Sequence, residues 1–195
     1  MAATELHALR RDQIGAFGKL LPPGRATLRV QLIEPLHILS IRMLPGGAEA
    51  VAGAVHSAGV PSLPVAGHFT GEDPMVLWRN PTELLLVTQH RSVSDSILSE
   101  LPPAAEASAY AVDQSDGLVA FELRGSALGA LLPRLMDASA VPLEAGRGVR
   151  ARLADIAVIA MRLDTQCAWL IADRANDQYL AQWVAYATDA LDAIL

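Results

Sequence analysis

The sequence predicts an α+β protein made of two tandem duplicated ferredoxin-like units, with mainly antiparallel sheets covered by helices. Three observations predict this class. One order of elements occurs twice along the chain, apolar residues alternate along short segments, and the last segment carries apolar residues at helical spacing. The chain has 195 residues, which is enough to bury a core without disulfides or a metal.

The internal repeat is seen in two pairs of segments. "RNPTELLLVTQHRSVSDSIL" resembles the later "RLDTQCAWLIADRANDQYLA", and "HILSIRMLPGGAEAVAGAV" resembles "VAFELRGSALGALLPRL". In the first pair the matched residues lie 83 positions apart: Thr82 and Thr165, Glu83 and Gln166, Arg91 and Arg174, Ile97 and Leu180. In the second pair Leu39 matches Phe121 and Arg42 matches Arg124. Each half therefore reads strand, helix, strand, turn, strand, helix.

Residues 1–30 lie outside this repeat and are expected to form an N-terminal arm. The arm is broken by Gly15, Gly18 and the "PPG" of residues 22–24. Its mostly apolar stripe has helical spacing: Leu6, Leu9, Gln13, Ile14, Phe17, and Leu20 or Leu21. A helix interrupted by glycine is unstable alone in water, so an ordered arm needs support from its own body or from a partner.

Residues 31–113 are expected to form the first α+β half. Its first helix is predicted from Ala48 to Ala58, after "PGG" and before Gly59 and Pro61. Two paired strands flank "NPTE", because proline presets its own backbone angle and cannot donate to a central ladder. The segment "ASAYAVD" reads as the last strand of this half.

Residues 114–195 are expected to form the second α+β half, packed with the first into one compact unit. Gly125 is expected to end a strand, and Ser126 is the predicted N-cap of the helix "ALGALLPRLM". The last helix is predicted from five apolar residues that share one face: Leu180, Trp183, Val184, Ala187 and Leu191.

The junction "DQSDG" between the halves allows two interpretations. Short polar side chains such as Asp113, Ser115 and Asp116 bond neighbouring backbone groups and turn the chain, which is the interpretation we favour. Paired carboxylates also serve as acid and base or hold a cation, but such sites need further groups placed by the fold. The nearby "GSALG" lacks the lysine of a P-loop and the spacing of a dinucleotide fingerprint or a nucleophile elbow.

The cysteine, histidine, tryptophan and clustered arginine residues predict no catalytic residue and no metal site in this chain. They leave the cofactor-binding residues unknown. Cys167 lies in the apolar run "CAWLIA", as a buried thiol does. Five histidines lie in different expected elements, without metal-ligand spacing: His7, His37, His56, His68 and His90. Three tryptophans lie in apolar segments and are expected to pack in the core or at an interface: Trp78, Trp169 and Trp183. One basic cluster reads as a solvated loop and strand edge, with an anion or an acidic subunit as the alternative partner: Arg147, Arg150 and Arg152.

Composition limits the partners and the compartment. The net charge of -6 and the scattered basic residues argue against nucleic acid. A lone cysteine fits a reducing compartment, and no apolar run has the length of a signal peptide or a membrane span. We therefore expect a cytoplasmic protein without a membrane partner. The hydrophobic share of 52%, much of it alanine, favours an apolar surface that binds a partner.

Four segments together resemble the gamma subunit of heterotetrameric sarcosine oxidases: "PPGRATLRV", "WRNPTELLLV", "AVDQSDGLVAFELRGSALGALLPRLM" and "RLADIAVIAMRL". The resemblance covers nearly the whole chain and includes Trp78, Pro81 and Glu83 around a turn. It implies a fold like that of the folate-binding aminomethyltransferases. No motif matches the acidic residue that folate-dependent relatives use, so no catalytic residue is carried over.

The resemblance implies an accessory role in an oxidoreductase complex. In that family the alpha, beta and delta subunits are the partners, and they carry FAD, FMN, NAD, zinc and tetrahydrofolate, whereas this chain is expected to bind none of these cofactors. The complex oxidatively demethylates sarcosine, and related complexes act on other N-methyl or secondary amines. The alternative is a stand-alone folate or one-carbon-binding protein, with Arg79, Glu83 and the arginine cluster around a cavity. A homo-oligomer that pairs its own apolar surface is a third possibility.

Overall fold

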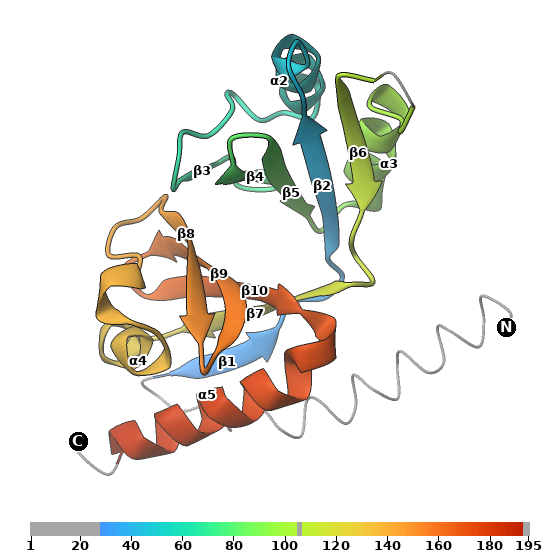
Figure 1. Cartoon of the computed structure of the whole chain (residues 1–195). Coiled ribbons are helices and arrows are strands. Elements are labelled where there is room, and N and C mark those ends of the chain that lie inside the picture. The colour runs from blue at the N-terminus through green and yellow to red at the C-terminus, as the bar shows by residue number, and fades with distance from the viewer. Residues whose placement is uncertain (1–27, 105–106, 193–195) are drawn as a thin grey trace, which may run out of the picture.

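The computed structural model describes residues 28–104 and 107–192, and it has the two-half arrangement that the repeat predicted (Figure 1). Both halves contain the strand, helix, strand, strand, helix order of a ferredoxin-like unit. The first half has these elements: β2 (His37–Met43), α2 (Ala48–Ser57), β3 (Phe69–Thr70), β4 (Met75–Asn80), β5 (Glu83–Thr88), α3 (Arg91–Glu100) and β6 (Ala109–Asp113).

The second half repeats this order after the junction. It has these elements: β7 (Leu118–Arg124), α4 (Leu128–Leu135), the 3-10 turn η1 (Ala138–Ala140), β8 (Gly148–Leu153), β9 (Ile156–Asp164), β10 (Cys167–Asp173), the 3-10 turn η2 (Arg174–Asn176) and α5 (Asp177–Asp192). One further strand, β1 (Arg29–Leu32), precedes both halves.

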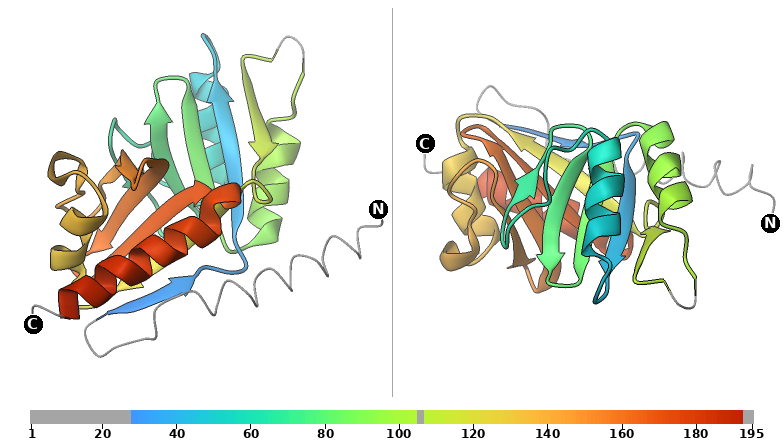
Figure 2. Two further views of the ribbon diagram at one scale, coloured as in Figure 1. Left: turned by 60° about the horizontal axis from the view of Figure 1, so that its bottom comes forward. Right: turned by 90° about the horizontal axis from the view of Figure 1, so that it is seen from above.

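Each half contributes a five-stranded antiparallel sheet, and the two sheets have corresponding strand orders. The first is β3-β4-β5-β2-β6 and the second is β8-β9-β10-β7-β1. The helices α2 and α3 lie on one sheet and α4 and α5 on the other, each pair on the side away from the opposite sheet (Figure 2). The last place in each sheet is filled by β6 and by β1 respectively.

Strand β1 crosses the boundary that the sequence suggested between arm and first half. Residues 31 and 32, which we assigned to the first half, pair with β7 in the second sheet, as Leu32 opposite Phe121 shows. Within the described residues no strand follows α5, and β1 holds the place in the second sheet that β6 holds in the first. The second sheet therefore depends on a segment that comes before the first.

Three apolar clusters hold the molecule together. One lies under α4 and α5 and includes Phe121 and Leu180, and one lies under α2 and α3 and includes Leu39 and Ile97. The third joins the two sheets, and its buried members come from both halves: Ile33, Ile38, Met75, Leu77, Leu85, Val87, Ala120, Met161, Cys167, Trp169 and Ile171. Each sheet buries apolar residues on both faces, one under its helices and one against the other sheet. The strand sequences are therefore nearly continuous hydrophobic runs.

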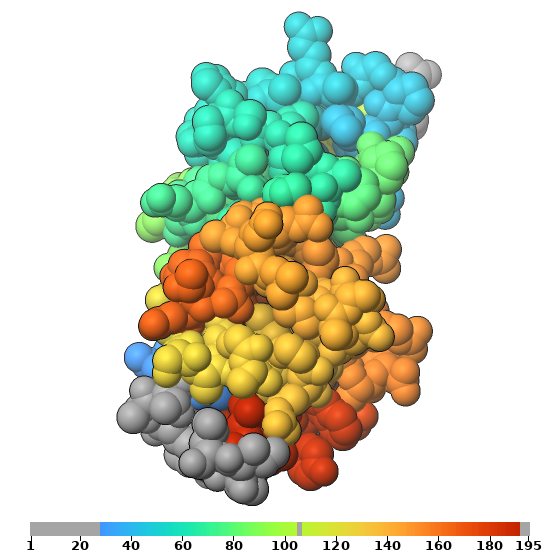
Figure 3. All heavy atoms as spheres, turned by 90° about the vertical axis from the view of Figure 1, so that its left-hand side faces the viewer, coloured from blue at the N-terminus to red at the C-terminus, as the bar shows by residue number. Residues whose placement is uncertain are grey.

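The two sheets are also joined at one edge by backbone hydrogen bonds. Phe69 N donates to Gly146 O at 3.0 Å, and Gly148 N donates to Gly67 O at 3.0 Å. His68 and Arg147 form an antiparallel bridge between these bonds. Figure 3, which faces this side, shows the two halves in close contact.

The structure corrects the internal alignment by one residue in the hairpins. Both hairpins skip one residue of the first strand, so Trp78 pairs with Leu84 and Arg162 pairs with Ala168. Trp78 therefore corresponds to Arg162, 84 rather than 83 positions away, and Glu83 corresponds to Cys167 rather than Gln166. The sequence alignment matched Thr82 with Thr165, but the position of each residue relative to the bulge decides which side of the sheet it faces.

The predicted helices and turns are largely confirmed, with one exception at α4. Helix α2 covers residues 48–57, and the turn at Pro81 separates β4 from β5. The expected cap at Ser126 is wrong, because α4 has Ala127 at its N-cap and no side-chain cap. Leu128 N bonds back to Gly125 O at 3.2 Å, so a tight turn precedes the helix and leaves Ser126 exposed.

Candidate functional site

A cleft of about 740 Å³ lies at the seam where the chain passes between the halves. Two connections line it, residues 33–36 between β1 and β2 and residues 113–118 between β6 and β7. The beginning of α3 and the beginning of η2 also reach it, through Arg91 and Arg174. The duplicated fold thus brings two equivalent helix starts together around one hollow.

The junction residues that the sequence analysis named lie on this cleft and bond mainly to the backbone. Asp113 Oδ1 accepts hydrogen bonds from the Ser115 backbone N (2.8 Å) and from its hydroxyl. The Ser115 hydroxyl oxygen accepts from Ile38 N at 3.0 Å. These are the turn-forming bonds that the favoured interpretation predicted.

Arg174 fastens the same junction to the second half. Its Nε donates to the carbonyl oxygen of Asp116 at 3.1 Å, and its Nη2 donates to those of Ser115 and Leu118 at 3.3 and 2.9 Å. Three carbonyl groups of one connection are thereby held by one side chain, which makes the junction part of the second half's framework.

A buried carboxylate, Glu83, lies on the side of the first sheet that faces the second sheet. Its side chain is 4% exposed. Glu83 Oε1 accepts hydrogen bonds from Ser40 Oγ at 2.7 Å and Arg79 Nη1 at 2.6 Å, and Oε2 accepts from Asn80 Nδ2 at 3.1 Å. Arg42 Nη2 lies 3.5 Å from Oε2. Burial alone raises the pKa of Glu83, but these donors and cations outweigh it and hold the pKa below its ordinary value.

The second sheet has a matching cluster with the acid on the neighbouring strand. Glu122 accepts from Arg124 Nη2 at 3.2 Å and from the indole Nε1 of Trp169 at 3.3 Å, and the Cys167 thiol lies 3.6 Å from its Oε2. By sheet register Glu122 corresponds to Ser40 and Cys167 corresponds to Glu83. Each half thus places an acid beside a hydroxyl or thiol and an arginine, with the acid and its small partner exchanged between strands.

In the second cluster, the pKa values of Glu122 and Cys167 are both shifted away from neutral pH. Burial raises the pKa of Glu122, but the hydrogen bonds from Arg124 and Trp169 lower it further than burial raises it. Burial and the Glu122 charge raise the pKa of the Cys167 thiol to about 12. An acid–base catalyst works best with a pKa near the working pH, and neither group is tuned in that direction.

The residues proposed for a folate cavity are not among those that line the cleft. Arg79 and Glu83 bond to each other, and the cleft lining includes neither of them. Arg150 and Arg152 are exposed on the edge strand β8, as the solvated interpretation predicted. Arg147 lies 3.5 Å from His68 and is also outside the cleft lining.

One charged residue that the sequence analysis did not single out is buried. Arg162 is 8% exposed and occupies the place that Trp78 has in the first half. Its Nη2 donates to the carbonyl oxygen of Thr165, and its Nε has no hydrogen-bond partner. When the two hairpins are aligned at their bulges rather than at Thr82 and Thr165, Trp78 corresponds to Arg162. That alignment shows an aromatic residue in the first half replaced by a cation in the second.

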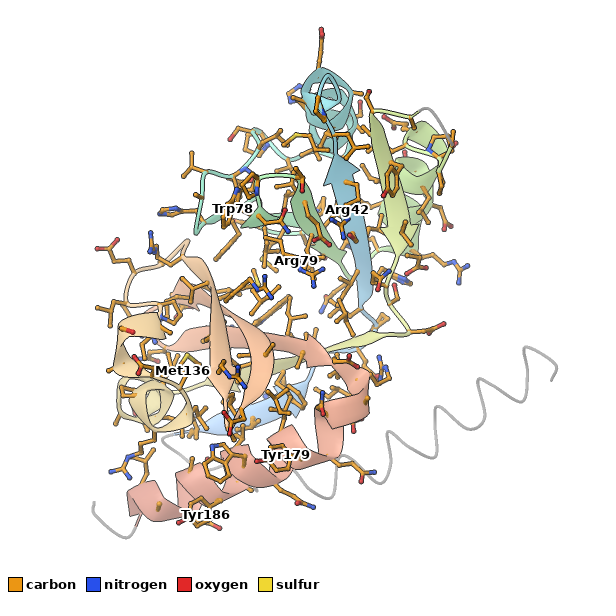
Figure 4. The ribbon with its side chains drawn as sticks, in the orientation of Figure 1. Arg42, Trp78, Arg79, Met136, Tyr179 and Tyr186 are labelled. Atoms are coloured by element: carbon orange, nitrogen blue, oxygen red, sulfur yellow. The ribbon has the colours of Figure 1, made fainter. Side chains whose placement is uncertain are left out.

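The tryptophans and the last helix behave as predicted. Trp169 is buried between the sheets, and Trp78 and Trp183 pack against the cores under the helices. On α5, Tyr179 and Tyr186 are 47% and 66% exposed (Figure 4). The rings of Trp183 and Tyr186 lie 5.6 Å apart. This set of Tyr179, Trp183 and Tyr186 is called the α5 aromatic face below.

Within residues 28–104 and 107–192, no group of three or more histidine, cysteine or carboxylate side chains is placed to hold a metal ion. His7 and the arm up to residue 27 lie outside the described residues. No helix of the described part has both the length and the apolarity needed to cross a membrane.

Solved structures similar to this chain in fold include a sarcosine oxidase chain and an aminomethyltransferase. A chain of the heterotetrameric sarcosine oxidase from Corynebacterium sp. U-96, in complex with pyrrole 2-carboxylate, matches with a TM-score of 0.75 and 22% identity over 91% of both chains. The glycine cleavage system aminomethyltransferase T from Bartonella henselae matches with a TM-score of 0.59 and 13% identity, over 82% of this chain and 46% of that one. No protein-family model and no curated protein matches the sequence.

The two likenesses differ in extent. This chain and the sarcosine oxidase chain cover each other almost completely, whereas less than half of the aminomethyltransferase is matched. The predicted α+β fold with two duplicated units is therefore confirmed as aminomethyltransferase-like. The chain has the fold of a sarcosine oxidase subunit.

Proposed function

We propose that this chain is an accessory, non-catalytic subunit of a flavin-dependent complex that oxidatively demethylates sarcosine or a related N-methyl or secondary amine, with tetrahydrofolate as one-carbon acceptor. The observation that carries the proposal is the end-to-end likeness to one chain of a heterotetrameric sarcosine oxidase. A likeness covering 91% of both chains fits a subunit of the same size and shape. In this proposal the partners correspond to alpha, beta and delta subunits that hold FAD, FMN, NAD, zinc and tetrahydrofolate.

Two features of the molecule support an accessory role. The space between the sheets is filled by apolar side chains from both halves, such as Leu77 and Trp169. The acids beside that space, Glu83 and Glu122, are paired with arginines and hold a lowered pKa. Such groups stay ionised at neutral pH, which suits a structural ion pair better than proton transfer.

The α5 aromatic face supports binding to another chain. Tyrosine and tryptophan are enriched at the energetic centres of protein interfaces. Tyr186 is 66% exposed on α5, and Tyr179 is 47% exposed although its hydroxyl donates to the carbonyl oxygen of Ala154, in the turn between β8 and β9, at 3.4 Å (Figure 4). We infer that this face contacts a larger subunit of the complex.

The test is native mass spectrometry on the tagged chain, purified gently from its own host. The expected result is a stoichiometric complex with larger chains, yellow from bound flavin, that produces hydrogen peroxide when sarcosine or another secondary amine is added. A chain that is recovered alone, under conditions that keep a known heteromeric complex of the same host intact, contradicts the proposal. A rise in melting temperature of the isolated chain with tetrahydrofolate would favour the stand-alone folate-binding alternative.

A further inference from the structure

Two arginines of the first sheet are held by one buried carboxylate. Arg79 Nη1 lies 2.6 Å and Arg42 Nη2 lies 3.5 Å from the carboxylate of Glu83, whose side chain is 4% exposed. Both arginines lie on the side of the first sheet that faces the second, and their side chains are 33% and 42% exposed (Figure 4). One buried anion is therefore shared by two cations that reach the solvent.

Two further arginines lie on the facing side of the second sheet. Arg150 pairs with Ile159 across β8 and β9, and Ile159 packs in the apolar cluster between the sheets, so both side chains are on that side. Arg152 comes two residues later on β8 and therefore lies on the same side. Strand β8 passes close to β4 of the first sheet. The set of Arg42, Arg79, Arg150 and Arg152 is called the inter-sheet basic face below.

The inter-sheet basic face has more cations than carboxylates to pair with them. The carboxylates that contact it are the buried Glu83 and Asp155, whose 94% exposed side chain lies 3.5 Å from an arginine of β8. Among the described residues, the Arg150 side chain has no hydrogen-bond or ion-pair partner. Within the same part of the chain, Arg42 and Arg79 have no acceptor besides Glu83. The whole chain has a net charge of -6, so this excess of positive charge is local.

The arrangement favours a run of carboxylates over a single small anion. A guanidinium group binds a carboxylate through two parallel N–H groups, and Glu83 holds Arg42 and Arg79 in place before a partner arrives. The four arginines come from both sheets, and none of them lines the cleft at the seam. Several acids on one extended segment reach both sheets, whereas one small anion meets only part of the face.

We propose that the inter-sheet basic face binds an acidic polypeptide segment of a partner chain. Carboxylates of this segment bridge Arg42 and Arg79, and neighbouring carboxylates pair with Arg150 and Arg152 on the second sheet. Because the rest of the chain is acidic, an acidic partner is repelled least at this face. The inference concerns binding alone and does not depend on whether the partner chain belongs to an oxidoreductase complex.

The test is fluorescence anisotropy of the full chain with a short fluorescein-labelled peptide of mixed aspartate and glutamate. The control peptide has the same label and length, with asparagine and glutamine in place of the acids. At low ionic strength the acidic peptide is expected to bind at least about tenfold more tightly than the control, and about 0.5 M NaCl should release it. Equal binding of the two peptides overturns the proposal. Complete displacement of the peptide by an equal concentration of inorganic phosphate also overturns it, because it would show a small-anion site instead.

Two variants locate the binding face, and a third is their control. Arg79→Gln and Arg150→Gln are each expected to weaken binding of the acidic peptide about fivefold. Arg134→Gln removes the same charge from an exposed position on α4, which covers the other side of the second sheet, and should bind as the wild type does. Arg79→Gln also takes a partner from the buried Glu83, whereas Arg150 is exposed and its substitution leaves the fold intact. Arg150→Gln is therefore decisive, and the proposal is overturned when it binds the acidic peptide like Arg134→Gln.

Discussion

At the scale of the residue, the two acid clusters show what a duplicated fold keeps and what it exchanges. Both sheets place an arginine, Arg42 or Arg124, opposite the first residue of the returning hairpin strand. The acid is on the hairpin strand in the first half, as Glu83, and on the partner strand in the second, as Glu122. Arg42 pairs with Glu83 across the strands, and Arg124 pairs with Glu122 on its own strand. Each half therefore keeps an ion pair although the acid lies on a different strand.

Glu83→Gln is expected to lower the free energy of unfolding by about 2 kcal/mol at pH 7, because Arg42 and Arg79 lose their buried anion. The native pKa of Glu83 lies below its ordinary value, so its stabilisation is present above the unfolded-state pKa and is lost as pH falls through the native pKa. Urea unfolding at pH 7 and at about pH 3 should show the difference between variant and wild type shrinking in acid. The exposed Glu49→Gln is the control, and a constant difference at both pH values contradicts this assignment.

The sequence could indicate these residues only in part. Glu83 stood out beside a turn, and Cys167 in an apolar run predicted a buried thiol, which the structure confirms. Ser40 and Glu122 gave no signal, because a polar residue inside an apolar strand is recognised as buried only when the opposite strand is known. The cleft was equally hidden, since Ser94 and Asp113 come from different elements that meet only in the fold.

At the scale of the element, local signals placed most helices and strands, and the failures have one cause. Glycine, proline and apolar spacing are read along the chain, so α2, α5 and the β4–β5 turn could be predicted. The cap at Ser126 and the offset of the repeat depend on a turn and on bulges that hydrogen bonds between strands create. Single-residue shifts of this kind leave the sequence pattern almost unchanged.

Gly47, the N-cap of α2, and Gly53, inside the helix, are expected to respond oppositely to alanine. A Cβ at Gly47 would lie 2.1 Å from the carbonyl oxygen of Ser108, so Gly47→Ala must push α2 away from β6 and should cost about 2 kcal/mol or more. Gly53 is an exposed helical position with nothing within 4 Å, and Gly53→Ala should add about 0.5–1 kcal/mol of stability. Thermal and urea unfolding of both variants check this, and a stabilising Gly47→Ala contradicts the close approach.

The α5 aromatic face gives a prediction for the complex. Tyr186→Glu is expected to reduce recovery of the larger chains at least about tenfold, because it puts a charge at the centre of an apolar contact. The stability of the isolated chain should change by less than about 0.5 kcal/mol, since Tyr186 is 66% exposed. Val65→Glu, at a 68% exposed position in the first half, is the matched control. Equal recovery of both variants would place the interface elsewhere.

At the scale of the whole molecule, the halves are repeats in pattern but are not independent domains. The second sheet takes β1 from the N-terminal side of the first half, and the apolar cluster between the sheets takes residues from both. Hydrogen bonds at Gly67 and Gly146 add a third connection. The repeat could be predicted from the sequence, whereas the use of β1 could not, because a four-residue strand outside the repeat has no internal match.

These connections predict that the two halves unfold together. Val30 lies on β1, is 7% exposed and packs in the cluster under α4 and α5, so Val30→Ala should cost about 2 kcal/mol. If the halves are one cooperative unit, the loss appears equally in Trp78, which reports the first half, and in Trp169 and Trp183, which report the second. Urea unfolding of single-tryptophan versions, each with and without Val30→Ala, measures this. Coincident midpoints that shift together support the single unit, and a shift confined to the second-half tryptophans would show that the first half unfolds on its own.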